Sequence, residues 1–84
     1  MNRESVLESI ESIFREVLNN SHISINENTT GLDIEEWNSL THLNLILAVE
    51  KKFQIKFKLT ELATFKKIGD IIDVLLGINS EKKM

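Results

Sequence analysis

The sequence contains no cysteine and no proline, and only three glycines and two histidines. Without cysteine, the chain can form neither a disulfide nor a thiolate metal site. The histidines, His22 and His42, are far apart and no His-Glu-x-x-His pattern is present, so a metal site lacks ligands. Because Gly31, Gly69 and Gly77 are isolated, a glycine-rich phosphate loop is excluded as well.

Long apolar runs are also lacking. The longest run extends from Leu45 to Val49, far short of the roughly 20 residues that a helix needs to span a bilayer. Residues 1–4 lead into an acid-containing segment, so we expect no secretory signal. These features predict a cytoplasmic protein that does not insert into a membrane.

The net charge of −3 conceals a gradient along the chain. Residues 1–50 hold nine acidic and two basic residues, a net charge of −7, whereas residues 51–84 hold four acidic and eight basic residues, a net charge of +4. An acidic first half disfavours nucleic-acid binding and would steer basic partners toward it.

Apolar residues recur every three or four positions from Asn2 to Leu18, which predicts an amphipathic helix. Asn2 is placed to cap this helix. From Asn19 to Asn38 no sustained period is present, so we expect a long loop, and loops of this length are usually functional. Its predicted anchors in the core are Ile23, Ile25, Leu32 and Ile34.

The most apolar helix is expected from Ser39 to Phe53, with its hydrophobic residues in two stripes. The first is predicted to face the core: Leu45, Ile46, Val49 and Phe53. The second, called here the leucine stripe, consists of Leu40, Leu43 and Leu47. Either the leucine stripe is an exposed contact surface, or the helix is central and all three leucines are buried.

The remainder of the chain predicts two further helices. Residues 54–58 alternate in polarity and are expected to form an extended connection with Ile55 and Phe57 pointing inward. A short helical turn is expected at 59–63 and a last helix at 67–76, with Gly77 as its C-cap. The predicted buried face of the last helix is Ile68, Ile71, Ile72, Leu75 and Leu76. The fold class is therefore all-α, a bundle of three main helices plus a short third helix.

Ser39 stands where the polar loop becomes the apolar helix. The simple interpretation is an N-cap, whose side-chain oxygen accepts a hydrogen bond from a free N–H group of the first turn. Alternatively, the hydroxyl carries chemistry, because the positive end of a helix stabilises an attached phosphate. A hydrolytic triad with His42 and Asp33 is disfavoured, because no glycine-bearing elbow surrounds the serine. Trp37 is expected to be a packing anchor rather than a binding aromatic.

Two motifs resemble those of acyl carrier proteins. That family has Asp-Ser-Leu at the start of a helix that ends in Glu-x-x-Phe-x-Ile, and the corresponding residues here are 38–40, Asn-Ser-Leu, and 50–55, Glu-Lys-Lys-Phe-Gln-Ile. The resemblance extends over roughly Val6 to Leu75. It implies that Ser39 carries phosphopantetheine, attached by a phosphopantetheinyl transferase, and that the serine-bearing helix is the recognition helix.

On this resemblance we expect a single carrier domain over residues 1–78 and a frayed tail over 79–84. The protein would be a monomer and not an enzyme, carrying acyl groups as thioesters and meeting acyl-transferring or acyl-activating enzymes through Asn38 and the leucine stripe. Asn38 replaces the usual Asp, and Thr41, Asn44 and Lys51 make the recognition helix less acidic than is usual. These departures favour a dedicated fatty acid, lipid or polyketide-type pathway. The alternatives are an aminoacyl or peptidyl carrier and an unmodified helical interaction module.

Overall fold

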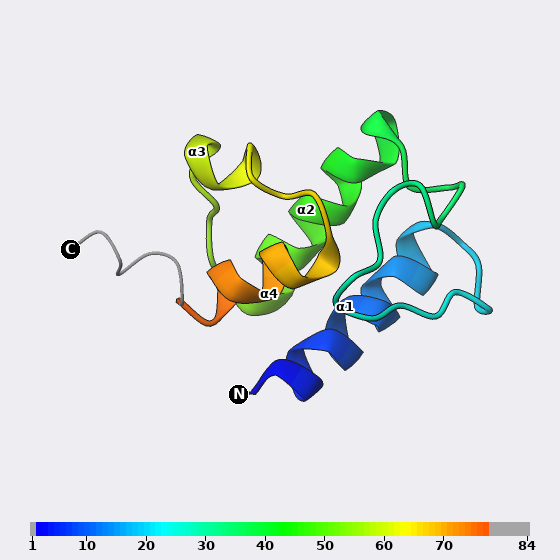
Figure 1. Ribbon diagram of the computed structural model, residues 1–84, viewed down its shortest axis with the longest axis horizontal. Helices are drawn as coiled ribbons and strands as arrows, with labels where there is room; N and C mark the ends of the chain where they lie inside the picture. The colour runs from blue at the N-terminus through cyan, green and yellow to red at the C-terminus, as the bar shows by residue number, and fades with distance from the viewer. Residues whose placement is uncertain (1, 78–84) are drawn as a thin grey trace.

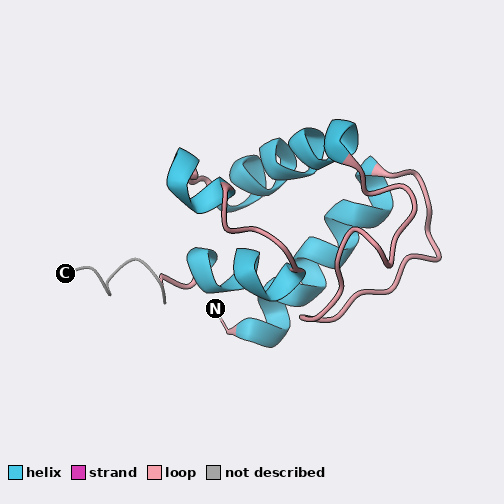
Figure 2. Ribbon diagram, turned by 45° about the horizontal axis from the view of Figure 1, so that its top comes forward, coloured by secondary structure: helices cyan, strands magenta, loops and turns pink. Residues whose placement is uncertain are grey.

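The computed structural model describes residues 2–77, and the predicted tail at 79–84 lies outside them. Within this range the chain forms four helices: α1 (Arg3–Val17), α2 (Ser39–Phe53), α3 (Leu59–Leu62) and α4 (Ile68–Leu75). Helix α1 contacts both α2 and α4. The long loop, residues 19–38, and α3 lie on opposite sides of the molecule (Figures 1 and 2). The predicted all-α class and helix order are confirmed.

Helix α1 begins at a capping box formed by Asn2 and Ser5. The Asn2 side chain accepts a hydrogen bond from the Ser5 backbone N–H at 2.8 Å, and the Ser5 hydroxyl oxygen accepts one from the Asn2 N–H at 3.2 Å. This reciprocal capping box satisfies two otherwise free backbone donors. The buried side chains of α1 are Val6, Ile10, Ile13 and Phe14. Asn19 then takes a positive φ of 54°, which ends the helix as expected.

The core is built from the predicted apolar positions. Helix α2 buries Leu45, Ile46 and Val49, and α4 buries Ile68, Ile71 and Ile72. Leu75 and Leu76, also predicted for the buried face, are partly buried against this core, as is Phe53. Apolar burial of this kind supplies most of the stability of a small helical domain.

The extended connection after α2 points inward as predicted. Phe57 is buried, Ile55 is partly buried, and the Phe57 ring meets Phe65 edge-on with ring centroids 5.0 Å apart. The Glu50 carboxylate accepts a hydrogen bond from the Phe57 N–H at 2.7 Å, which fixes the connection against the end of α2. The shorter helices differ from prediction only at their ends. Ala63 is the C-cap of α3, Lys67 is the N-cap of α4, and Leu76, rather than the predicted Gly77, is the C-cap of α4.

Three of the four predicted loop anchors, Ile23, Ile25 and Ile34, are buried. The prediction for Leu32 is wrong, since its side chain is 98% exposed. The reason is a tight turn at 30–33, in which the Thr30 N–H donates to the Asp33 carboxylate at 2.9 Å and the Asp33 N–H donates to the Thr30 carbonyl at 3.0 Å. Leu32 lies at the tip of this turn and therefore projects into solvent.

Two backbone hydrogen bonds hold the long loop against the first turn of α4. The Ile68 N–H donates to the Thr29 carbonyl at 3.0 Å, and the Gly69 N–H donates to the Glu27 carbonyl at 2.8 Å. These carbonyls satisfy two of the free donors that every helix start exposes. The loop is therefore held by backbone bonds as well as by its buried isoleucines.

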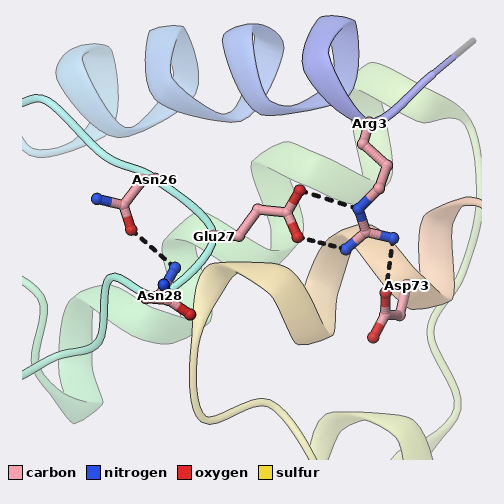
Figure 3. Close-up of polar contacts among 5 residues, drawn as sticks. All are labelled: Arg3, Asn26, Glu27, Asn28 and Asp73. Atoms are coloured by element: carbon pink, nitrogen blue, oxygen red, sulfur yellow. Dashed lines mark hydrogen bonds and ion pairs between the residues drawn. The ribbon is translucent and has the colours of Figure 1, made fainter.

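Arg3 adds side-chain hydrogen bonds and an ion pair at the same place. Its guanidinium donates to both carboxylate oxygens of Glu27, at 2.9 and 2.6 Å, and forms an ion pair with Asp73 at 2.8 Å. Figure 3 shows the guanidinium between the loop and α4. These hydrogen bonds raise the pKa of Arg3, and the bond from Arg3 lowers the pKa of Glu27 below its ordinary value. The start of α1, the loop and α4 are thus joined through one cation.

The close contact between the loop and Gly69 predicts that Gly69→Ala destabilises the fold, although alanine favours a helix more than glycine does. A Cβ at this position would lie 3.0 Å from the Glu27 carbonyl oxygen, which is held by its own bond from the Gly69 N–H. We expect the free energy of unfolding, measured in urea, to fall by about 1–2 kcal/mol. In the control variant Asn44→Ala, an exposed position of α2, stability should be unchanged or slightly higher. A stabilised Gly69→Ala protein would contradict the proposed close contact.

Candidate functional site

The N-cap of α2 is Asn38 and not Ser39, so the simple interpretation of Ser39 is wrong. The Asn38 side-chain oxygen accepts hydrogen bonds from the Leu40 N–H at 2.9 Å and the Thr41 N–H at 3.1 Å. Thr41 completes the cap, because its hydroxyl oxygen accepts from the Asn38 N–H at 2.9 Å. Ser39 is therefore the first helical residue, and another side chain has taken the capping role.

The Ser39 hydroxyl is consequently free for chemistry. The residue is exposed, and its side chain forms no hydrogen bond to the rest of residues 2–77. No acidic residue stands in the first turn of α2 to offset the positive end of the helix. This combination of an accessible oxygen and an uncompensated positive helix end suits a covalently attached anion.

Trp37 is the packing anchor that the sequence predicted. It is only 8% exposed, and its ring meets Phe14 of α1 edge-on with centroids 5.0 Å apart. Such aromatic pairs add to the free energy gained by burying their area. Because Trp37 directly precedes the Asn38 cap, its burial anchors the start of α2 to the core and fixes the direction in which the helix begins.

Sequence reasoning did not find the pairing between Trp37 and His42. The indole Nε1–H donates to His42 Nδ1 at 3.0 Å, and the two rings are stacked with centroids 6.0 Å apart. His42 is half-buried, and burial lowers its pKa below the ordinary value of 6.5. Spacing alone gave no sign of this pair, because it joins a loop residue to the first turn of a helix.

The disfavoured hydrolytic triad is not assembled. The Asp33 carboxylate accepts from the Thr30 backbone N–H, and His42 Nδ1 is already used by Trp37. His42 therefore has no carboxylate to orient it toward Ser39. Among residues 2–77, no three potential metal ligands lie close enough together to hold an ion.

A hollow of about 340 Å³, called here the serine-side hollow, opens beside Ser39. It is lined by Gly31, Trp37, Asn38, Ser39, His42, Phe65 and Lys66. Phe65 and Lys66 belong to the connection between α3 and α4, and no local sequence signal linked them to the serine. Lys67 pairs with Thr30 in an isolated antiparallel bridge, which brings that connection alongside the loop.

The leucine stripe is exposed: Leu40 is 81%, Leu43 60% and Leu47 54% accessible. The alternative that all three are buried is therefore wrong. Beyond Leu47 lies a second hollow of about 440 Å³, the distal hollow, which includes Lys51, Ile55 and Lys56. Exposed leucines in a row along one helix are unusual for a protein without partners.

The comparisons with known proteins agree with this arrangement. Residues 8–75 match the family described as "Phosphopantetheine attachment site". Among solved structures, the solution NMR structure of a holo acyl carrier protein from Geobacter metallireducens is similar, with 36% identity and a TM-score of 0.80 over 93% of this chain and 90% of that one. No curated protein matches the sequence. None of the helices in the described part of the chain is long and apolar enough to cross a membrane.

The burial of His42 makes the stability of the site dependent on pH. Because the folded-state pKa of His42 is lowered, the unfolded chain binds more protons as the pH falls through the ordinary value of 6.5. We therefore expect the His42 contribution to be complete above that pH and to be lost progressively as the pH falls from 6.5 through the lower pKa of the folded state.

The control for this effect is His42→Asn, whose side-chain oxygen can still accept from Trp37 but does not titrate. The difference in unfolding free energy between the two proteins, measured in urea at several pH values, isolates the histidine. A His42 titration midpoint at or above 6.5 in an NMR titration would contradict the structure.

Proposed function

The chain belongs to the phosphopantetheine-attachment family of acyl carrier proteins, and from that membership we propose that Ser39 is the residue that carries the prosthetic group. The observation that carries this proposal is the free hydroxyl at the first position of α2, with capping left to Asn38. Members of this family are carriers and not enzymes. The chain therefore presents a cargo to other proteins without transforming it.

The residues around Ser39 fit the phosphate of such a group. The backbone N–H groups and the dipole of the first turn of α2 favour an anion at this place, and no nearby acid of that turn opposes it. Lys66 lines the same hollow, is exposed, and forms no ion pair within residues 2–77. The site thus offers both a point of attachment and compensating positive charge.

When attached, phosphopantetheine supplies a distal thiol that holds a carboxylic acid as a thioester. The polypeptide contains no cysteine and could not supply that thiol itself. Tethering the cargo makes its delivery effectively intramolecular once a partner has docked, so that modest contacts suffice for transfer.

The cargo is proposed to be an acyl group of a dedicated fatty acid, lipid or polyketide-type pathway. The recognition helix supports this, because Thr41, Asn44 and Lys51 give it a neutral-to-basic character. An enzyme adapted to an acidic carrier surface would find little to bind along this helix. A partner that recognises this surface is therefore expected to be specialised.

A second candidate, a carrier of amino acids or other short acids, is favoured by the packing beside α2. Ile46 and Val49, which could line a cavity for a lipid together with Leu62, are 3% and 0% exposed and belong to the packed core. A long chain would have to displace this packing, whereas a short cargo could remain outside it.

The proposed partners are a phosphopantetheinyl transferase and acyl-transferring or acyl-activating enzymes. Asn38 and the leucine stripe, at the start and along the exposed face of α2, would form the docking surface. A cytoplasmic monomer is proposed, and the net charge of −7 on residues 1–50, which include Ser39, disfavours a nucleic-acid partner.

Intact-mass measurement after incubation with coenzyme A and a phosphopantetheinyl transferase tests the attachment. We expect the chain to gain the mass of one phosphopantetheine group, and Ser39→Ala to gain none while keeping its helical circular dichroism. The matched control Ser12→Ala, at an exposed serine of α1, should be modified as the unchanged protein is. Modification that persists in Ser39→Ala would overturn the assignment.

The docking surface is tested by the rate of that same modification. For Leu43→Ser we expect kcat/KM to fall roughly tenfold, on the order of 1–2 kcal/mol of lost apolar contact with the transferase. Leu59→Ser is the control, because Leu59 is 82% exposed but lies on α3 outside the stripe. Equal values of kcat/KM for the two variants would show that the leucine stripe takes no part in binding this enzyme.

A further inference from the structure

We propose that the serine-side hollow is a resting site for the proximal part of the phosphopantetheine arm, with His42 Nε2–H as a hydrogen-bond donor to it and Lys66 as the cation beside its phosphodiester. The inference rests on the proposed attachment at Ser39 and concerns this chain's own residues. It assigns a binding role to side chains on three segments: the loop, α2 and the connection before α4.

The first step is the tautomer of His42. The indole Nε1–H of Trp37 can only donate, so His42 Nδ1, 3.0 Å away, must be the acceptor. A neutral imidazole whose Nδ1 accepts carries its proton on Nε2. Trp37 therefore fixes His42 as a neutral Nε2–H donor, independently of any ligand.

The second step is the position of that donor. His42 follows Ser39 by three residues, so that their side chains project from neighbouring places on one helix face, with Cβ atoms about 5–6 Å apart. Both residues line the serine-side hollow. Nε2–H has no acceptor among residues 2–77, although the ring is half-buried. An amide carbonyl or phosphate oxygen of an arm attached at Ser39 would lie within reach of it.

The third step is the opposite wall of the hollow. The connection that carries Phe65 and Lys66 is held in place, because the Lys66 N–H donates to the Asp70 carboxylate at 2.9 Å and the Phe65 ring meets Phe57 edge-on. Phe65 and Trp37 give the hollow apolar surfaces suited to the dimethyl group of the pantoyl unit. The unpaired ammonium of Lys66 suits the phosphodiester.

The size of the hollow limits what rests there. About 340 Å³ is near the lower end of the range for small-molecule sites, enough for part of the arm but not for the arm together with a long cargo. One neutral hydrogen bond favours the bound position by roughly 2- to 10-fold. The arm would therefore rest in the hollow when the carrier is alone and be released when a partner offers better contacts.

The experiment compares NMR spectra of the ¹⁵N-labelled chain before and after modification with coenzyme A and a phosphopantetheinyl transferase. We expect modification to shift the Trp37 indole N–H, the Phe65 and Lys66 amides and the His42 Nε2 resonance. Residues of the distal hollow, Ile55 and Lys56, should not shift. Cross-relaxation between the dimethyl protons of the arm and the Phe65 ring would locate the arm directly.

Two variants separate binding from mere proximity to the modified serine. His42→Asn keeps an acceptor for Trp37 but has no donor at the position of Nε2, because its amide nitrogen is one bond closer to the backbone. Lys66→Met removes the cation from an exposed position. Each should reduce the shifts at Phe65 at least twofold, and Lys66→Met should also change the ³¹P shift of the phosphodiester. The matched control Lys67→Met, at an exposed neighbour that does not line the hollow, should leave the shifts unchanged.

The outcomes distinguish this inference from the proposed function. Gain of phosphopantetheine without shifts at Trp37 and Phe65, or shifts that survive both variants undiminished, would overturn the resting site and leave the carrier function intact. A chain that gains no phosphopantetheine overturns both proposals.

Discussion

The structure depends on the bonds between the long loop and the first turn of α4. A loop of this length has a large entropy to lose, and buried isoleucines alone would leave its backbone donors and acceptors unpaired. The carbonyls of Glu27 and Thr29 instead complete the start of α4, and Arg3 holds Glu27 and Asp73 together. With the loop fixed at its middle, its last residues arrive at α2 in a defined direction. The position of Ser39 follows from that arrangement.

At the start of α2, three adjacent residues have separate roles. Trp37 packs into the core, Asn38 satisfies the free N–H groups of the first turn, and Ser39 is left exposed. If Ser39 were the cap, its oxygen would be occupied by the backbone, and attaching a group there would cost the helix about 1 kcal/mol. Assigning the cap to the neighbouring asparagine avoids that conflict between stability and chemistry.

The helices and most of the core could be predicted from the sequence, because in a helix the spacing of apolar residues decides which positions are buried. Two local errors have physical causes. Leu32 was placed in the core by its hydrophobicity, but the Thr30–Asp33 turn carries it outward. Ser39 was a reasonable cap by residue type, and only the observed bonds distinguish it from Asn38.

The candidate site could be predicted only where it is local in sequence. Ser39 and the leucine stripe lie on one helix, although period alone could not decide whether the stripe is buried or exposed. The serine-side hollow is different, because Phe65 and Lys66 reach it through the bridge between Thr30 and Lys67, distant in the chain. The donor state of His42 likewise depends on Trp37, which lies outside the helix. Contacts between separate segments leave no trace in the spacing of residues along one helix.

The capping arrangement at α2 has a consequence for the lifetime of the protein. Because Asn38 and not Ser39 caps the helix, a chain with an unmodified serine keeps the whole cap. Proteases that degrade unfolded chains would then spare the unmodified form for as long as it stays folded.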